Sequence, residues 1–169
     1  DGTIVDGDEV RIMKTADDAT NYGISAKLTC TWNNREVIIN GANASGVVDG
    51  TIVTIDGDGL NSSTPMMEIS VSTVDNVIFS HLKFDAADTA QHCIESTAVN
   101  NHHVNWVNCQ FTSATSHGIF TNNLAQYWNY INCRFDNNGD SGLEHQSSMY
   151  GGVHKCLFDN NAGDGARLG

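Results

Sequence analysis

Four side chains suited to binding or cleaving a saccharide recur at nearly regular intervals in the second half of the chain. Glu95, Phe120, Glu144 and Arg167 follow one another at nearly equal steps, each the length of one sequence repeat. Paired carboxyl groups supply the acid and the base, or the acid and the nucleophile, of glycoside hydrolysis. An aromatic ring between them offers a flat apolar face against which a sugar ring can stack. The set can act only if the fold brings its members together.

Three histidines lie close to this set in the sequence, and an imidazole can transfer protons near neutral pH. The candidate catalytic residues are therefore Glu95, Glu144 and His117, and the candidate ligand-binding residues are Phe120, His92, His145 and Arg167. Two simpler interpretations stay open. Glu144 and Arg167 could form an ordinary surface ion pair, and the histidines could cap turns.

The elements that must position these side chains are repeated. The segments VIFSHLKFD, VNWVNCQFT, WNYINCRFD and GGVHKCLFD align without gaps, and their phenylalanines, Phe84, Phe111, Phe135 and Phe158, recur at steps of 27, 24 and 23 residues. Within each segment the apolar positions are i, i+2, i+5 and i+7. Since strand side chains alternate between two faces, the jump of three indicates a corner after which the same side points inward.

A further apolar position follows each phenylalanine after a short turn, at Ile94, Ile119, Leu143 and Ala166. Each repeat therefore supplies three short strands that cannot bury their apolar sides alone. Stacking the repeats about 4.8 Å apart closes a continuous core. The residue that follows each of these apolar positions then points outward, which predicts an exposed column of Glu95, Phe120, Glu144 and Arg167. Glu95 and Glu144 would be about 9–10 Å apart at the backbone.

The predicted fold is all-β: a right-handed, single-stranded parallel β-helix with coils of about 23–27 residues, within the range of solenoid repeats. One domain spans 1–169, with an N-terminal segment at 1–23, irregular early coils at 24–66 and regular coils at 67–169. The segment Thr15–Thr20 is expected to form one helical turn or a loop. The final part of the sequence looks like the middle of a repeat, so we expect a fragment of a longer chain.

This pattern resembles the parallel β-helix repeat of pectate-lyase-like proteins and viral tailspikes, through the Asn108-Cys109 and Asn132-Cys133 corners and the Gly118-Ile119 strand. The segments QHCIES and SHGIFT are similar to the paired DDCI and GHGI coils of polygalacturonases. Gln91 and His92 stand where that family has two catalytic aspartates, so its acid–base pair is not carried over.

Stacking also predicts ladders of like residues. We expect packed free thiols at Cys109, Cys133 and Cys156, a corner ladder of His81, Asn108, Asn132 and Lys155, and stacked turns at 136–138 and 159–161. No cysteine or histidine spacing fits a zinc site, and no cofactor is expected. The Asp56–Gly59 loop could hold Ca²⁺, but it lacks the full spacing of a known calcium loop, and such a loop is more often a plain turn.

The chain carries 20 acidic and 8 basic residues and a net charge of −12. Such a surface repels phosphate backbones and anionic lipids, so neither nucleic acid nor a membrane is an expected partner. We predict a carbohydrate-facing β-helix of a virion or cell-surface protein that binds a polysaccharide. One alternative is an extracellular polysaccharide hydrolase, preferred to a lyase because basic residues are scarce. Another is a structural rod or virion assembly module, as a homotrimer or stacked on further coils.

Overall fold

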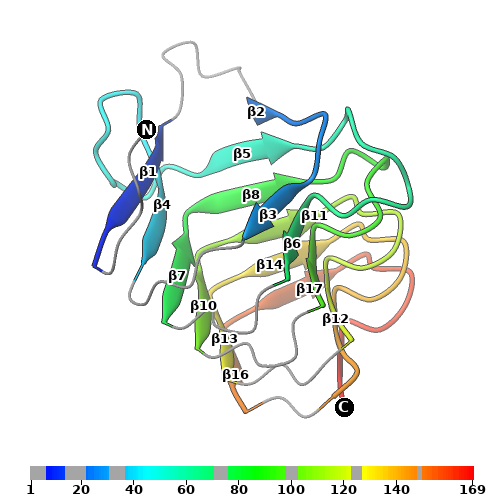
Figure 1. The fold of residues 1–169 in the computed structure, drawn as a ribbon. Helices are drawn as coiled ribbons and strands as arrows, with labels where there is room; N and C mark the ends of the chain where they lie inside the picture. Colours follow the sequence, from blue (N-terminus) through cyan, green and yellow to red (C-terminus); the bar gives the residue numbers. More distant parts are fainter. Residues whose placement is uncertain are drawn as a thin grey trace.

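The computed structural model describes residues 7–13, 22–30, 37–70, 76–97, 103–122, 127–147 and 150–169. These residues form strands and turns and no helix, and the strands make three parallel sheets wound into a β-helix (Figure 1). The all-β parallel β-helix expected from the repeat is therefore confirmed. No helix in the described ranges has the length and apolarity needed to cross a membrane.

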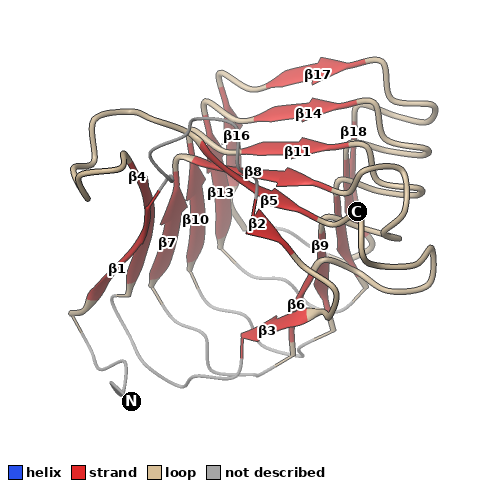
Figure 2. Cartoon of the chain, turned by 90° about the horizontal axis from the view of Figure 1, so that it is seen from above, coloured by secondary structure: helices blue, strands red, loops and turns tan. Residues whose placement is uncertain are grey.

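Each sheet collects one strand from every coil, and the three sheets face one another around the core (Figure 2). Sheet A contains β1 (Glu9–Met13), β4 (Ile38–Ala42), β7 (Val77–Ser80), β10 (Val104–Val107), β13 (Trp128–Ile131) and β16 (Gly152–His154). Sheet B contains β2 (Tyr22–Gly23), β5 (Val53–Asp56), β8 (Leu82–Asp85), β11 (Gln110–Thr112), β14 (Arg134–Asp136) and β17 (Leu157–Asp159). Sheet C contains β3 (Leu28–Cys30), β6 (Met67–Ile69), β9 (Ile94–Ser96), β12 (Ile119–Thr121), β15 (Leu143–His145) and β18 (Ala166–Leu168).

The register of sheet B places the repeated phenylalanines directly over one another. Phe111 pairs with Phe84 on one side and Phe135 on the other, and Phe135 pairs with Phe158. Successive ring centroids are 5.7, 5.0 and 4.9 Å apart and the planes are nearly parallel. Offset stacking of this kind stabilises aromatic pairs beyond the area that they bury. The four phenylalanines therefore form an internal aromatic stack, as the predicted stacking of the coils requires.

The corner between sheets A and B is built from residues in the left-handed backbone region. His81, Asn108, Asn132 and Lys155 have φ values of 56°, 53°, 54° and 53°. Asn tolerates this conformation because its short amide can bond locally. Asn132 Nδ2 donates to Asn108 Oδ1 at 2.7 Å, and Asn108 Nδ2 donates to His81 Nε2 at 3.0 Å. His81, Asn108 and Asn132 of the predicted corner ladder thus form a directed chain of hydrogen bonds.

The thiols are free, as expected, and they lie along the inner side of the same corner. Cys109 Sγ donates to the Phe79 carbonyl at 3.5 Å, and Cys133 Sγ donates to the Trp106 carbonyl at 3.3 Å. Burial raises the pKa of Cys109 to about 12, so this thiol stays protonated at neutral pH. These cysteines behave as small core residues.

The early coils depart from the regular repeat. Strand β1 pairs with β4 and strand β2 pairs with β5, so sheets A and B already begin within 1–23. The first coils also pack less tightly, around an apolar cavity of about 240 Å³ whose lining includes Val10, Leu28 and Met67. Thr15–Thr20, expected as a helical turn or loop, lies outside the described residues.

We predict that Phe111→Ala lowers the free energy of unfolding by about 3–5 kcal/mol, because the fully buried ring leaves a cavity between two stacked neighbours. Urea denaturation followed by circular dichroism measures the loss. Ile131→Ala is the matched control, because Ile131 lies on the outer side of the next coil and is 40% exposed. Equal losses in the two variants would contradict an internal phenylalanine stack.

Candidate functional site

The outward residues of sheet C form one continuous column along the β-helix axis, which we name the outer column. In register order it contains Thr29, Glu68, Glu95, Phe120, Glu144 and Arg167. The residues before them in each of the middle strands, Ile94, Ile119 and Leu143, are fully buried. Alternation along each strand therefore points the column outward. The four residues predicted to meet do so, each one coil from the next.

Exposure along the outer column differs from the sequence expectation. The expectation of an exposed column is wrong at Glu144, which is only 5% exposed. Arg167 Nη1 donates to Glu144 Oε2 at 3.3 Å, and Gln146 Nε2 donates to Glu144 Oε1 at 3.1 Å. These long side chains cover the carboxylate while they hydrogen-bond to it. Glu95 and Phe120 are half-buried and remain accessible.

Two imidazoles flank the aromatic member of the column. The rings of His92 and His117 lie nearly parallel to Phe120, with centroids 5.0 and 5.2 Å from it, and 5.3 Å from each other. His92 Nδ1 accepts the His117 backbone N–H at 3.3 Å, and His117 Nδ1 accepts the Ser141 backbone N–H at 3.3 Å. In a neutral ring with Nδ1 as acceptor, Nε2 carries the proton. The backbone thus sets the orientation of both rings.

Burial and the neighbouring His117 ring lower the pKa of His92 to about 4. His92 is therefore uncharged at neutral pH and adds a flat ring beside Phe120 rather than a positive charge. His117 Nδ1 lies 3.7 Å from Glu144 Oε2, which is too long for a hydrogen bond. The backbone bond from Ser141 accounts for the orientation of His117 better than this carboxylate does.

His145 does not lie on the outer column. It is fully buried, with Nδ1 bonded to the Thr121 hydroxyl at 2.8 Å and Nε2 bonded to the Tyr130 hydroxyl at 2.9 Å. The physical reason is alternation along β15, in which Leu143 and His145 point inward and Glu144 points outward. Its position beside the outer column was inferred from sequence adjacency, and the structure corrects it.

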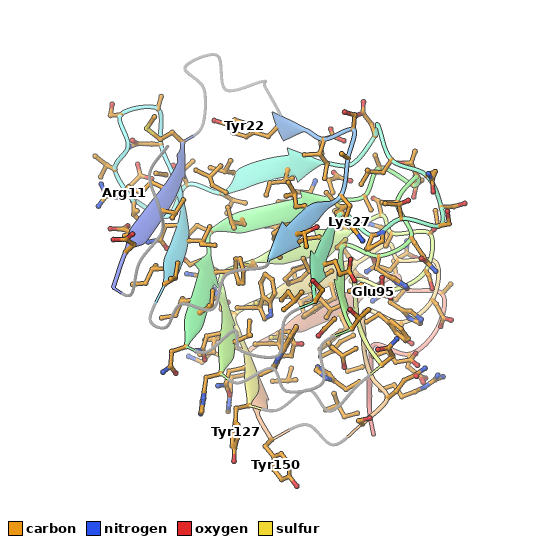
Figure 3. All side chains as sticks on the ribbon, viewed as in Figure 1. Arg11, Tyr22, Lys27, Glu95, Tyr127 and Tyr150 are labelled. Carbon is orange, nitrogen blue, oxygen red and sulfur yellow. The ribbon has the colours of Figure 1, made fainter. Side chains whose placement is uncertain are left out.

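Two residues of the site were missed from the sequence, Glu68 and Lys27. Glu68 pairs in register with Glu95 on the adjacent coil, accepts a hydrogen bond from the Thr97 hydroxyl at 3.0 Å and forms an ion pair with Lys27. Figure 3 shows Lys27 and Glu95 on the side of the molecule that carries β3 and β6. Glu68 precedes Glu95 by one repeat step, so the periodicity could have revealed it.

The pKa values of the neighbouring Glu68 and Glu95 carboxyl groups are shifted in opposite directions. The hydrogen bond from Lys27 lowers the pKa of Glu68. Burial and the adjacent Glu68 carboxylate raise the pKa of Glu95. One carboxylate and one more readily protonated carboxyl group therefore sit side by side. Such a divided pair is the arrangement that acid–base or acid–nucleophile chemistry requires.

No group of three or more His, Cys, Asp or Glu side chains within the described ranges is placed to hold a metal ion. In the Asp56–Gly59 loop, Asp56 Oδ1 accepts the Asp58 backbone N–H at 3.1 Å, which is turn chemistry. Calcium binding by this loop stays a prediction.

The chain matches no protein-family model, no curated protein and no solved structure. The structure therefore establishes a parallel β-helix, and any function must be argued from the arrangement of its side chains.

The buried His145 predicts a loss of stability in acid. Burial lowers its pKa to about 4, against the usual 6.5, so between these values the unfolded chain binds a proton that the folded chain does not. Stability from this residue is complete above pH 6.5 and falls by roughly 3 kcal/mol as the pH drops to about 4. Urea denaturation at several pH values should show a shallower fall for His145→Gln than for the wild type. Parallel curves would contradict a neutral, buried imidazole.

Proposed function

We propose that the outer column of sheet C is a saccharide-binding face, and that the chain is a carbohydrate-facing β-helix of a virion or cell-surface protein. The observation that carries the proposal is the half-buried Phe120 ring, which packs against two buried, near-parallel imidazoles. Glu95 lies one coil away on one side of it and the Glu144–Arg167 pair on the other. An apolar platform with polar groups at both ends suits a sugar, which has apolar ring faces and a rim of hydroxyl groups.

The direction of the column favours a polymer over a single small molecule. Outward side chains recur once per coil, about every 4.8 Å, along one line of the sheet, and all of them are polar except Phe120. A chain of sugars lying along the axis could contact several coils at once, and each contact would add to the affinity. Because the chain is strongly acidic, a neutral polysaccharide suits this face better than a polyanion.

The resemblance to viral tailspikes and pectate-lyase-like proteins supports the same proposal. The segments QHCIES and SHGIFT, which resemble the paired polygalacturonase coils, contain strands β9 and β12 of sheet C. The same resemblance to viral tailspikes and pectate-lyase-like proteins is the support for a virion or extracellular location.

We predict that Phe120→Ala weakens polysaccharide binding by about 2- to 12-fold, the range expected when one aromatic contact is lost. A glycan array identifies the ligand, and titration calorimetry measures its dissociation constant. Tyr150→Ala is the matched control, because it removes an exposed aromatic ring on the sheet A side. An array on which the wild type binds no neutral glycan would refute the proposal.

A second candidate function is hydrolysis of the bound polysaccharide. The opposite pKa shifts of Glu68 and Glu95 favour it. The two residues are neighbours on adjacent coils, about 4.8 Å apart at the backbone. Retaining glycosidases hold their two carboxyl groups about 5–5.5 Å apart. Glu95 would donate the proton to the leaving oxygen and Glu68, kept ionised by Lys27, would be the nucleophile.

If the pair is catalytic, Glu68→Gln and Glu95→Gln should each lower the rate of reducing-end release by at least about 100-fold. Asp159→Asn removes an exposed carboxyl group from sheet B and should leave the rate unchanged. Circular dichroism checks that each variant is folded. Full activity in both glutamine variants would remove this pair from any mechanism. If Glu95→Gln and Glu144→Gln abolish activity and Glu68→Gln does not, the catalytic pair is instead Glu95 and Glu144. Their wider separation would fit an inverting reaction.

A further inference from the structure

A groove runs along the outer side of the corner between sheets A and B, away from the outer column. Its volume is about 470 Å³, within the range of small-ligand sites. We name it the corner groove. The residues that line it include Gly50, His81, Gln110, Asn132, Arg134 and Lys155. From His81 to Lys155 it crosses three coil spacings, about 14 Å.

The wall at one end of the corner groove is formed by an insertion at residues 43–52. Strands β7 and β8 are joined by His81 alone, and the later corners have two residues, whereas β4 and β5 are joined by residues 43–52. This loop has internal hydrogen bonds, including Asn43 Nδ2 to Asp49 Oδ2 at 2.8 Å, and Arg11 donates to the Gly46 carbonyl at 2.9 Å. Gly50 and Ile52 of this loop line the groove.

The charged side chains that line the corner groove are basic, although the chain as a whole is acidic. The whole sequence has 20 acidic and 8 basic residues. Arg134 and Lys155 are two of those eight, and no Asp or Glu is among the described residues that line the groove. At physiological salt a charge acts over about 8 Å, so Asp136 and Asp159, which pair with Arg134, offset part of this positive charge, and Lys155 adds a second cation.

The two cations occupy positions at which neighbouring coils carry uncharged residues. Lys155 follows Asn108 and Asn132 in the corner ladder, in a left-handed conformation (φ 53°) that suits Asn and is costly for a lysine. Arg134 pairs in register with Gln110 on the preceding coil. The repeat itself therefore does not require a cation at either position.

Arg134 is already oriented by neighbouring acids. Its Nε lies 3.2 Å from Asp136 Oδ1, and its Nη2 lies 3.7 Å from Asp159 Oδ2. A guanidinium has five N–H donors in a fixed plane, so these contacts leave donors that can bind a ligand carboxylate. The groove also holds amide groups of Gln110 and Asn132, which can bond hydroxyl groups.

We propose that the corner groove binds an acidic saccharide, with a sugar carboxylate held by Arg134 and Lys155 and hydroxyl groups held by Gln110 and Asn132. The volume and length exceed what a single inorganic anion needs. A nucleic acid would extend its phosphates beyond the groove onto a surface of net charge −12. The inference is independent of the outer column, which lies on a different sheet.

The repeat supplies substitutions that keep the fold. Lys155→Asn restores the ladder residue, and Arg134→Gln installs the residue of the preceding coil. Calorimetry with a short β-1,4-linked mannuronate oligomer, which carries one carboxylate per ring, should show affinity about tenfold weaker in each variant. The thermal midpoint of Lys155→Asn should not fall. The neutral β-1,4-linked mannose oligomer should bind the wild type at least about tenfold more weakly than the acidic one.

Lys83→Gln is the matched control. Lys83 lies in the same column of sheet B, pairs in register with Gln110, and contacts Asp85 at 2.7 Å, but it does not line the groove. Its loss should change affinity less than twofold. Equal weakening in all three variants would indicate only general charge attraction and would overturn the proposal. Undetectable binding of the acidic oligomer, or equal binding of the neutral one, would overturn it as well.

Discussion

Parallel hydrogen bonding between the backbones of successive coils is the constraint on which the rest of this structure depends. It sets strands from adjacent coils about 4.8 Å apart and in register, so residues separated by one repeat share the same environment. Phe111 lies between Phe84 and Phe135 for this reason alone. A side chain that packs well in one coil therefore packs well at the equivalent position of the next, and ladders of apolar and amide side chains extend along the axis.

The same constraint has different consequences inside and outside. Stacked rings and amides attract one another, but like charges one coil apart repel. Glu68 and Glu95 face this problem directly, and Lys27 and Thr97 reduce it by bonding to Glu68. Burial, together with the repulsion that remains from Glu68, raises the pKa of Glu95. A repeat that stacks an acid on an acid thus produces an unequal pair without a dedicated active-site loop.

The coil stacking could be predicted from the sequence because apolar spacing at i, i+2, i+5 and i+7 is a property of each repeat. The exposure of Glu144 could not, because it depends on the conformations of Gln146 and Arg167. The inward direction of His145 follows from alternation after Leu143, and adjacency in sequence was misleading there. Lys27 had no periodic signal, since the first coils are longer than the regular ones, as the pairing of Tyr22 with Ile55 shows.

Because the inward positions are committed to packing, new chemistry can enter this fold only at outward positions and in turns. The insertion at 43–52 lengthens one corner while β4 and β5 keep their places in sheets A and B. Arg134 and Lys155 likewise change the corner without altering the buried Phe135 and Cys133 beside them. Sheet C presents acids around an aromatic ring, and the corner presents cations in a groove. Two surfaces of different character can therefore coexist on one solenoid, since neither disturbs the core that supports both.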